Sequence, residues 1–170
     1  ILDVLNKEVA RAGDAFYIPT GRVHAIGAGV LLAEIQQTSD ITYRIYDYYR
    51  VDKVTGKTRE LHNDWALDVI NFEVQDQYKT NYDKTENQSN HLIHSDYFKS
   101  NIITLSSTLN KDYSSIDSFI IYICTKGSFE IALSNTTYIV KKGETFLVPA
   151  CIKEVILIPH HSAEILEVYY

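Results

Sequence analysis

Short runs of β-branched and aromatic residues recur through most of this chain, and tight turns separate many of them. Such residues are enriched in strands because they pack well on a pleated, half-buried surface. Turn-forming residues stand between runs at Thr125–Gly127, Ser134–Asn135 and Lys141–Glu144. This spacing predicts an all-β domain, either a sandwich or a barrel. The candidate strands are Ala15–Ile18, Val30–Gln36, Thr42–Tyr48, Ile102–Ser106, Ser118–Cys124, Ser128–Leu133, Thr137–Val140, Thr145–Val148, Glu154–Ile158 and Glu164–Tyr169.

One segment has a helical pattern instead. Asn63 is a good N-cap residue, and Asp64 stands in the first turn, where the helix dipole favours a negative charge. We therefore expect a single short amphipathic helix over Asn63–Ile70. Its apolar face at helical spacing is Trp65, Ala66, Val69 and Ile70.

A polar stretch with little periodicity, residues 75–90, divides the chain. We interpret it as an ordered connector between residues 1–74 and a second module at 91–170. The chain begins with Ile1 and contains no methionine, so we expect it to be part of a longer protein.

The net charge of −6 and the lack of a basic run argue against a nucleic-acid partner, although one well-placed cation would still suit a small anion. No apolar run approaches the roughly 18 residues needed to span a bilayer, and Ile1–Val4 does not resemble a secretory leader. We expect a cytoplasmic protein without membrane partners, in which Cys124 and Cys151 are buried free thiols.

The same spacing of a glycine and a proline occurs twice, 130 residues apart. Gly13 precedes Pro19 by six positions and His24 follows five positions later, while Gly143 precedes Pro149 by the same interval. Glycine suits the turn before a strand, and proline suits its end, where no ladder donor is needed. This pattern resembles the second conserved motif of the cupin superfamily, whose histidine binds a metal. The resemblance implies a cupin, that is, a jelly-roll or double-stranded β-helix barrel.

The second copy has Glu154 where the first has His24, and it lacks an upstream pair of histidines. We therefore expect residues 91–170 to form a degenerate cupin barrel without a metal site. His160 and His161 are interpreted as solvated loop residues. A metal role for His91 and His94, at the edge of the connector, is the less favoured interpretation.

The sharpest pattern combines His24, Glu34 ten positions later and Arg44 ten positions after that, with Asp40 shortly before the arginine. Together with the surrounding residues it resembles the signature of type I mannose-6-phosphate isomerases, particularly the short bacterial forms. The resemblance continues through residues 61–72 and, more weakly, through the C-terminal module. It implies a zinc enzyme that interconverts mannose 6-phosphate and fructose 6-phosphate through a cis-enediol.

The resemblance also implies roles for single residues. His24 is a zinc ligand, Arg44 is an electrophile or substrate clamp, and Glu34 is an acid/base or hydroxyl-binding group. Asp40 supports Arg44 or contacts a sugar hydroxyl. The residues alone leave another interpretation open, in which Glu34 and Arg44 form a structural ion pair across adjacent strands and His24 is a turn residue.

Other zinc ligands of this family precede the histidine by dozens of residues, and only 12 residues precede Gly13. We therefore expect the isolated chain to bind zinc negligibly and to be inactive, because one histidine is a weak zinc site. A non-catalytic cupin module for carbohydrate binding or oligomerisation is the main alternative. A different cupin enzyme, such as an oxygenase or epimerase, is a third hypothesis.

Overall fold

The computed structural model describes residues 1–39 and 41–170, so Asp40 lies outside the described residues. The chain divides into two compact units. The first unit comprises Ile1–Leu32 and Thr38–Lys79, and the second comprises Ala33–Gln37 and Thr80–Tyr170. The boundary at residues 79–80 falls within the stretch interpreted as a connector. Within the described ranges, no helix is long and apolar enough to cross a membrane.

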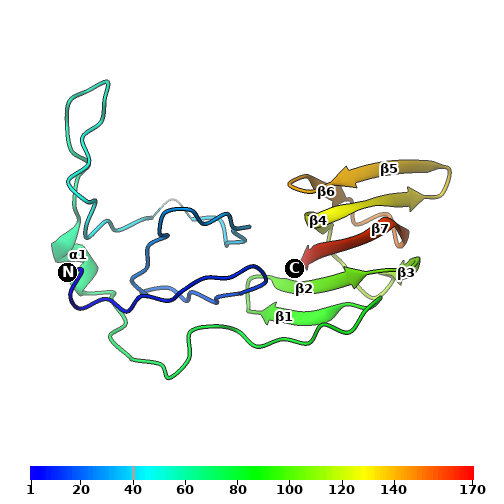
Figure 1. Ribbon diagram of the computed structural model, residues 1–170, viewed down its shortest axis with the longest axis horizontal. Coiled ribbons are helices and arrows are strands. Elements are labelled where there is room, and N and C mark those ends of the chain that lie inside the picture. Colours follow the sequence, from blue (N-terminus) through cyan, green and yellow to red (C-terminus); the bar gives the residue numbers. More distant parts are fainter. Residues whose placement is uncertain (40) are drawn as a thin grey trace. The chain divides into compact units, whose positions relative to one another are not determined.

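The second unit is built from antiparallel strands joined mostly by short connections. The sheet order is β1-β2-β7-β4-β5, with β3 paired to β7 and β6 paired to β4. Figure 1 shows β7 lying between β2 and β4. The strands are β1 (Asn90–His94), β2 (Lys99–Leu105), β3 (Leu109–Asp112), β4 (Ile120–Leu133), β5 (Thr136–Lys141), β6 (Thr145–Val148) and β7 (Glu154–Tyr169).

Two long strands hold this unit together. β4 pairs with β6 through Ile120–Ile123 and with β5 through Ser128–Leu133. β7 pairs with β3 through its first residues and with β2 through its last, while β4 and β7 pair with each other along most of their length. Irregularities on β4 between Cys124 and Phe129 let the strand bend between its two partners.

Gly127 makes this bend possible. Its φ of +72° is in the left-handed region, and a Cβ there would collide with the carbonyl oxygen of Ser162. Only glycine meets both conditions without strain. The side chains on the inner faces of the bent strands form one apolar core, which includes Ile103, Leu105, Ile120, Phe129, Ile131, Val148, Leu157 and Ile165.

The strand predictions for the second module are largely confirmed. Thr145–Val148 is β6 as predicted, and Thr137–Val140 lies within β5. Four predicted runs fuse in pairs to become β4 and β7, because the intervening residues stay extended through the bend. The strands β1 and β3 were not predicted, since their residues are mostly polar. His160 and His161 lie within β7, so their assignment to a loop was wrong.

The first unit has little regular structure. Its described residues contain one helix, α1 (Asn63–Leu67), and the isolated bridges Phe16↔Lys79 and Val51↔Thr58. The predictions of strands at Ala15–Ile18, Val30–Gln36 and Thr42–Tyr48 were wrong: these runs form no ladder. Their composition favours strands, but a strand exists only when a neighbour accepts and donates its backbone hydrogen bonds.

The helix and the cysteines differ from expectation in detail. α1 ends at Leu67 instead of Ile70, and its N-cap is His62 rather than Asn63. Of the expected apolar face only Ala66 is buried, while Trp65 is 61% exposed. Both cysteines are free, as expected, but Cys151 is exposed and only Cys124 is buried.

Candidate functional site

The turn that carries His24 is clamped from its own unit. Arg22 donates its backbone N–H to Pro19, and Asn71 donates its N–H to the carbonyl of Gly21 at 2.9 Å. Gly21 has a φ of +84°, and a Cβ there would collide with the carbonyl oxygen of Val69. The segment after α1 therefore packs directly on the backbone of the turn. This contact fixes the position from which the chain continues to His24.

His24 is exposed, and its Nδ1 lies 3.0 Å from the carbonyl oxygen of Arg22. A carbonyl can only accept, so Nδ1 must carry the hydrogen. In the neutral ring this leaves a lone pair on Nε2, the tautomer in which a histidine binds a metal through Nε2. Arg22 is itself anchored: its guanidinium donates to the carbonyl of Glu73 at 2.6 Å and lies 5.7 Å from the ring centre of Tyr78.

Arg44 is half-buried and held by the segment just before α1. Its backbone N–H donates to Nδ1 of His62 at 3.0 Å, and the N–H of His62 returns to the carbonyl of Arg44 at 2.7 Å. The guanidinium makes a long hydrogen bond, 3.4 Å, to the carbonyl of Glu60. The ring of His62 stacks on Trp65 with 7° between their planes. The backbone of Arg44 is thus well fixed, while its charged end is held weakly.

The structure assigns the predicted site residues to different units. His24 and Arg44 belong to the first unit, whereas Glu34 is exposed and belongs to the second. The pairing of Glu34 with Arg44 stays a prediction. Across residues 1–39 and 41–170, no group of three or more His, Cys, Asp and Glu side chains is placed to hold a metal ion. These residues therefore do not fit a zinc ion by themselves.

A buried carboxylate close to Arg44 in the sequence was missed. Asp47 is 6% exposed and accepts hydrogen bonds from Arg59 (Nε to Oδ2, 2.8 Å) and Arg50 (Nε to Oδ1, 3.0 Å). The hydrogen bond from Arg59, followed by that from Arg50, outweighs burial and lowers the pKa of Asp47 to about 2. This ion-pair cluster closes the hairpin turn whose two arms meet at the isolated bridge between Val51 and Thr58.

The second unit contains a larger buried polar group, which we call the interior polar cluster. It consists of Ser89, Asn101, Lys111, Tyr113, Tyr122 and Glu167. Asn101 on β2, Glu167 on β7 and Tyr122 on β4 are register partners on three adjacent strands. They follow the alternation that also points Ile103, Ile165 and Ile120 into the core. The cluster is therefore a polar layer within the apolar core.

Glu167 is the centre of this cluster and is 1% exposed. Its Oε1 accepts from the ammonium of Lys111 at 2.8 Å and from the hydroxyl of Tyr113. Its Oε2 accepts from Ser89 at 2.6 Å and from Asn101 at 2.8 Å. Four donors on one carboxyl group require the ionised form.

Electrostatics support that charge state. Burial alone would raise the pKa of Glu167, but the charge of Lys111 and the hydrogen bonds from Lys111, Ser89 and Tyr113 hold it below its ordinary value. Burial, followed by the charge of Glu167, raises the pKa of both Tyr113 and Tyr122, so both phenols stay protonated. Tyr113 donates to Glu167 and therefore accepts from Tyr122.

The cluster connects to the surface through a histidine. Asn101 uses its amide nitrogen on Glu167, and its Oδ1 faces Nε2 of His94 at 3.0 Å. The exposed ring of His94 packs against His91 with 3.9 Å between ring centres. The sequence signal for the cluster was Glu167 inside the otherwise apolar run Ile165–Tyr169, at a position that alternation points inward.

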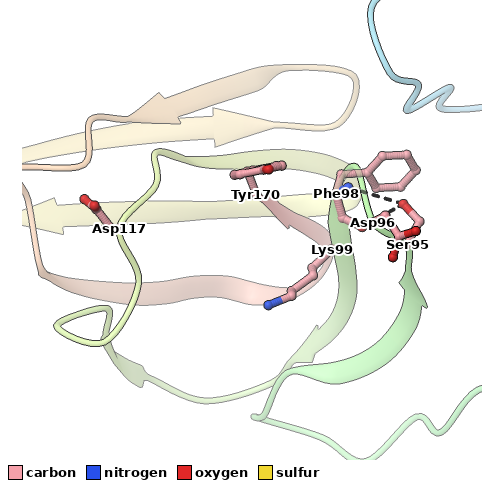
Figure 2. Close-up of a pocket in the computed structure, with 6 residues that line it drawn as sticks. All are labelled: Ser95, Asp96, Phe98, Lys99, Asp117 and Tyr170. Atoms are coloured by element: carbon pink, nitrogen blue, oxygen red, sulfur yellow. Dashed lines mark hydrogen bonds between the residues drawn. The ribbon is translucent and has the colours of Figure 1, made fainter.

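A shallow cleft of about 460 Å³ lies elsewhere on the second unit (Figure 2). Its lining is Ser95, Asp96, Phe98, Lys99, Asp117 and Tyr170. Ser95 closes the turn by accepting the N–H of Phe98 at 3.2 Å. Two carboxylates and one ammonium line the cleft, so it is a poor phosphate site, but its aromatic and polar lining suits a neutral, hydroxylated ligand.

The fold of the second unit has counterparts among known proteins. The crystal structure of the mannose 6-phosphate isomerase from Bacillus subtilis superposes with a TM-score of 0.62 and 25% identity, covering 78% of this chain and 41% of that one. Residues 87–163 match the family described as mannose-6-phosphate isomerase, cupin domain. The protein is therefore of the cupin class, and the predicted jelly-roll fold is confirmed.

Within that class the similarity is specific. The mannose-6-phosphate isomerase ManA of Bacillus subtilis is 34% identical over 149 residues, 86% of this chain and 46% of the relative. The mannose-6-phosphate isomerase of Streptococcus mutans is 48% identical over 67 residues, 39% of this chain and 21% of the relative. The chain is therefore similar, over residues 87–163, to the cupin domain of mannose-6-phosphate isomerases and, over most of its length, to part of ManA. It spans about half the length of ManA.

Proposed function

We propose that this chain is the C-terminal part of an isomerase that interconverts mannose 6-phosphate and fructose 6-phosphate in the cytoplasm. The observation that carries the proposal is the extent of the match to ManA. Its 149 residues exceed the second unit, which has 96 residues (5 in Ala33–Gln37 and 91 in Thr80–Tyr170). The similarity therefore includes much of the first unit, to which His24 and Arg44 belong.

The proposed reaction moves a proton between two neighbouring carbons through a cis-enediol. A base must reach the carbon beside the carbonyl, and the developing enediolate charge must be stabilised. The substrate phosphate needs a cationic anchor. Arg44 is our candidate for the cation, because its backbone is fixed by His62 while, among the described residues, its guanidinium makes only a long hydrogen bond to the carbonyl of Glu60. Glu34 is our candidate acid/base, and Asp40 a hydroxyl contact or a support for Arg44.

Zinc remains the metal that we propose for the assembled site, with His24 as one ligand. The hydrogen bond from Nδ1 to Arg22 supports this role, because it leaves Nε2 for a metal. The described residues supply no further ligands in a group, so the others would come from outside this stretch of 170 residues. The isolated chain should hold little zinc and show no turnover.

The test is isomerase activity in heavy water. The intact gene product should convert mannose 6-phosphate to fructose 6-phosphate and exchange deuterium at the carbon beside the carbonyl, since a cis-enediol exchanges its proton with solvent. The 170-residue chain should do neither. Absence of conversion by the intact, zinc-loaded protein would refute the proposal. Stoichiometric zinc in the isolated chain would refute the expectation that the other zinc ligands come from outside this stretch.

A second candidate is a non-catalytic carbohydrate-binding cupin. The observation that favours it is the cleft with Phe98 and Tyr170, whose rings offer flat surfaces for a sugar. Calorimetric titration with free mannose separates the two functions. This alternative would be favoured if the chain binds mannose, if Phe98→Ala abolishes that binding, and if the intact protein has no isomerase activity.

A further inference from the structure

We propose that the interior of the second unit contains a cation site built for a primary ammonium group, and that the side chain of Lys111 fills it. This inference is independent of the isomerase site, because every contact that carries it lies within the second unit. It concerns the interior polar cluster, which the proposed reaction does not use.

The surroundings of the Lys111 ammonium match the chemistry of an –NH₃⁺ group. The nitrogen lies 2.8 Å from a carboxylate oxygen of Glu167 and 2.6 Å from the hydroxyl of Ser89. It also lies 5.3 Å from the ring centre of Tyr113, within the range of a cation–π contact. The ammonium thus meets three electron-rich partners of different kinds: a carboxylate, a hydroxyl and an aromatic ring.

The rest of the site is held without Lys111. Tyr113, Ser89 and Asn101 all donate to Glu167, and Tyr122 supports Tyr113. These neutral donors keep the carboxylate oriented when the lysine side chain is removed. What removal leaves behind is one buried negative charge with no counter-charge, which strongly favours capture of a cation.

The site is also accessible and selective. Lys111 enters from β3, and its side chain is 15% exposed, so the channel left by its truncation reaches solvent. Of the carboxylates that the structure describes, only Glu167 pairs with the nitrogen, whereas divalent metals prefer several charged or imidazole ligands. A small alkylammonium ion supplies both the charge and the N–H groups. Tetramethylammonium has the same charge but no N–H donor.

The experiment is chemical rescue of Lys111→Ala in the full chain, followed by thermal unfolding. We expect a large loss in Tm that propylammonium restores progressively and saturably, as for a ligand that binds only the folded state. Tetramethylammonium at equal concentration should restore nothing beyond its effect on the unsubstituted protein. If Lys111→Ala does not fold alone, the same comparison is made on the yield of refolded protein.

Two variants make the test specific. Lys153→Ala removes a half-buried lysine whose ammonium donates to a backbone carbonyl, that of Ile116, and pairs with no carboxylate of the described residues, so propylammonium should not restore the Tm of this variant. Lys111→Ala combined with Glu167→Gln lacks the carboxylate and should lose the rescue. Equal rescue by the two ammonium ions, rescue that survives Glu167→Gln, or an unchanged Tm in Lys111→Ala would each overturn the proposal.

Discussion

Tyr122 and Glu167 are register partners on β4 and β7, and the hydroxyl of Tyr113 connects their polar atoms. The connection has a direction, because Tyr113 donates to the carboxylate and accepts from Tyr122. The two phenols are therefore not equivalent: one binds a charge and the other a neutral oxygen. Hydrogen bonds to charged groups contribute about twice as much as neutral ones.

Removing each hydroxyl should reveal this order. We expect Tyr113→Phe to lower the free energy of unfolding by about 1.5–3 kcal/mol and Tyr122→Phe by about 0.5–1.5 kcal/mol. Tyr169→Phe is the control, because its hydroxyl lies at the limiting distance of 3.5 Å from Asn101. Urea unfolding of the three variants measures these values. A larger loss for Tyr122→Phe than for Tyr113→Phe would contradict the assigned direction.

The stability should depend on pH through Glu167. Its folded-state pKa is lowered from the ordinary 4.5, so the group binds fewer protons when folded than when unfolded. Its stabilising contribution is therefore complete above the unfolded value and is lost as the pH falls through the folded value. We expect the stability difference between the unsubstituted chain and Glu167→Gln to be constant above about pH 5 and to narrow below it. Denaturant titrations across this pH range measure the free energy of unfolding of both proteins. A stability difference that grows as the pH falls would refute the lowered pKa of Glu167.

The hairpin closed by Asp47 should open locally when its carboxylate is removed. We expect Asp47→Asn to speed amide exchange over Asp52–Lys57, since Arg59 and Arg50 lose their shared partner. Arg59→Ala should speed exchange more than Arg50→Ala, because the hydrogen bond from Arg59 is the largest cause of the lowered pKa of Asp47. The same opening should occur in the unsubstituted chain as the pH falls from about 4 toward 2. Unchanged exchange in Asp47→Asn would show that the backbone turn alone holds the hairpin.

Two glycines with similar backbone angles should respond very differently to alanine. Gly127 and Gly143 both have positive φ, 72° and 86°, but only Gly127 has a neighbour within reach of an added Cβ. We expect Gly143→Ala to cost about 1–2 kcal/mol from the left-handed conformation alone. Gly127→Ala should add about 1–3 kcal/mol, because β4 and β7 must separate at Ser162. Thermal unfolding of both variants decides this, and equal losses would show that the bend relaxes freely.

Arg44 offers the sharpest test of the proposed chemistry. In the intact isomerase, Arg44→Ala should lower turnover about 100-fold or more, since a cation aimed at enediolate charge is worth several kcal/mol and each ~1.4 kcal/mol is a factor of ten. Arg44→Lys should recover only part, because it lacks the planar fork of arginine. If Arg44 is only the structural partner of Glu34, the result differs. Its replacement then lowers Tm with a near-normal rate, and the double variant with Glu34→Ala is no worse than either single one.

The sequence predicted the second unit well for a physical reason. Runs such as Thr145–Val148 become strands because neighbouring strands stand beside them and receive their hydrogen bonds. Val30–Gln36 and Thr42–Tyr48 have equally strong strand composition and form no ladder. Strand propensity describes how side chains suit a sheet, and the sheet itself has to be supplied by a partner strand.

The candidate sites divide in the same way. His24 and Arg44 were found through a resemblance. The hydrogen bonds that orient them, from His24 to the carbonyl of Arg22 and between Arg44 and His62, depend on loop geometry that no local pattern encodes. The interior polar cluster was not found at all. Its members come from four strands, the connector and the loop after β3, and only the register of β2, β7 and β4 makes Asn101, Glu167 and Tyr122 neighbours.

The sharing of β4 and β7 between different neighbours has a consequence for how the second unit comes apart. Each of these strands is one continuous backbone that pairs with one partner before the bend and with another after it. If one end of such a strand separates from its partner, the displacement is transmitted along the same backbone to the pairing at its other end. Opening at β3 is thereby tied to opening at β2, and loss of β6 to loss of β5. The unit should behave mechanically as a single body, in which a defect placed at either rim weakens the whole.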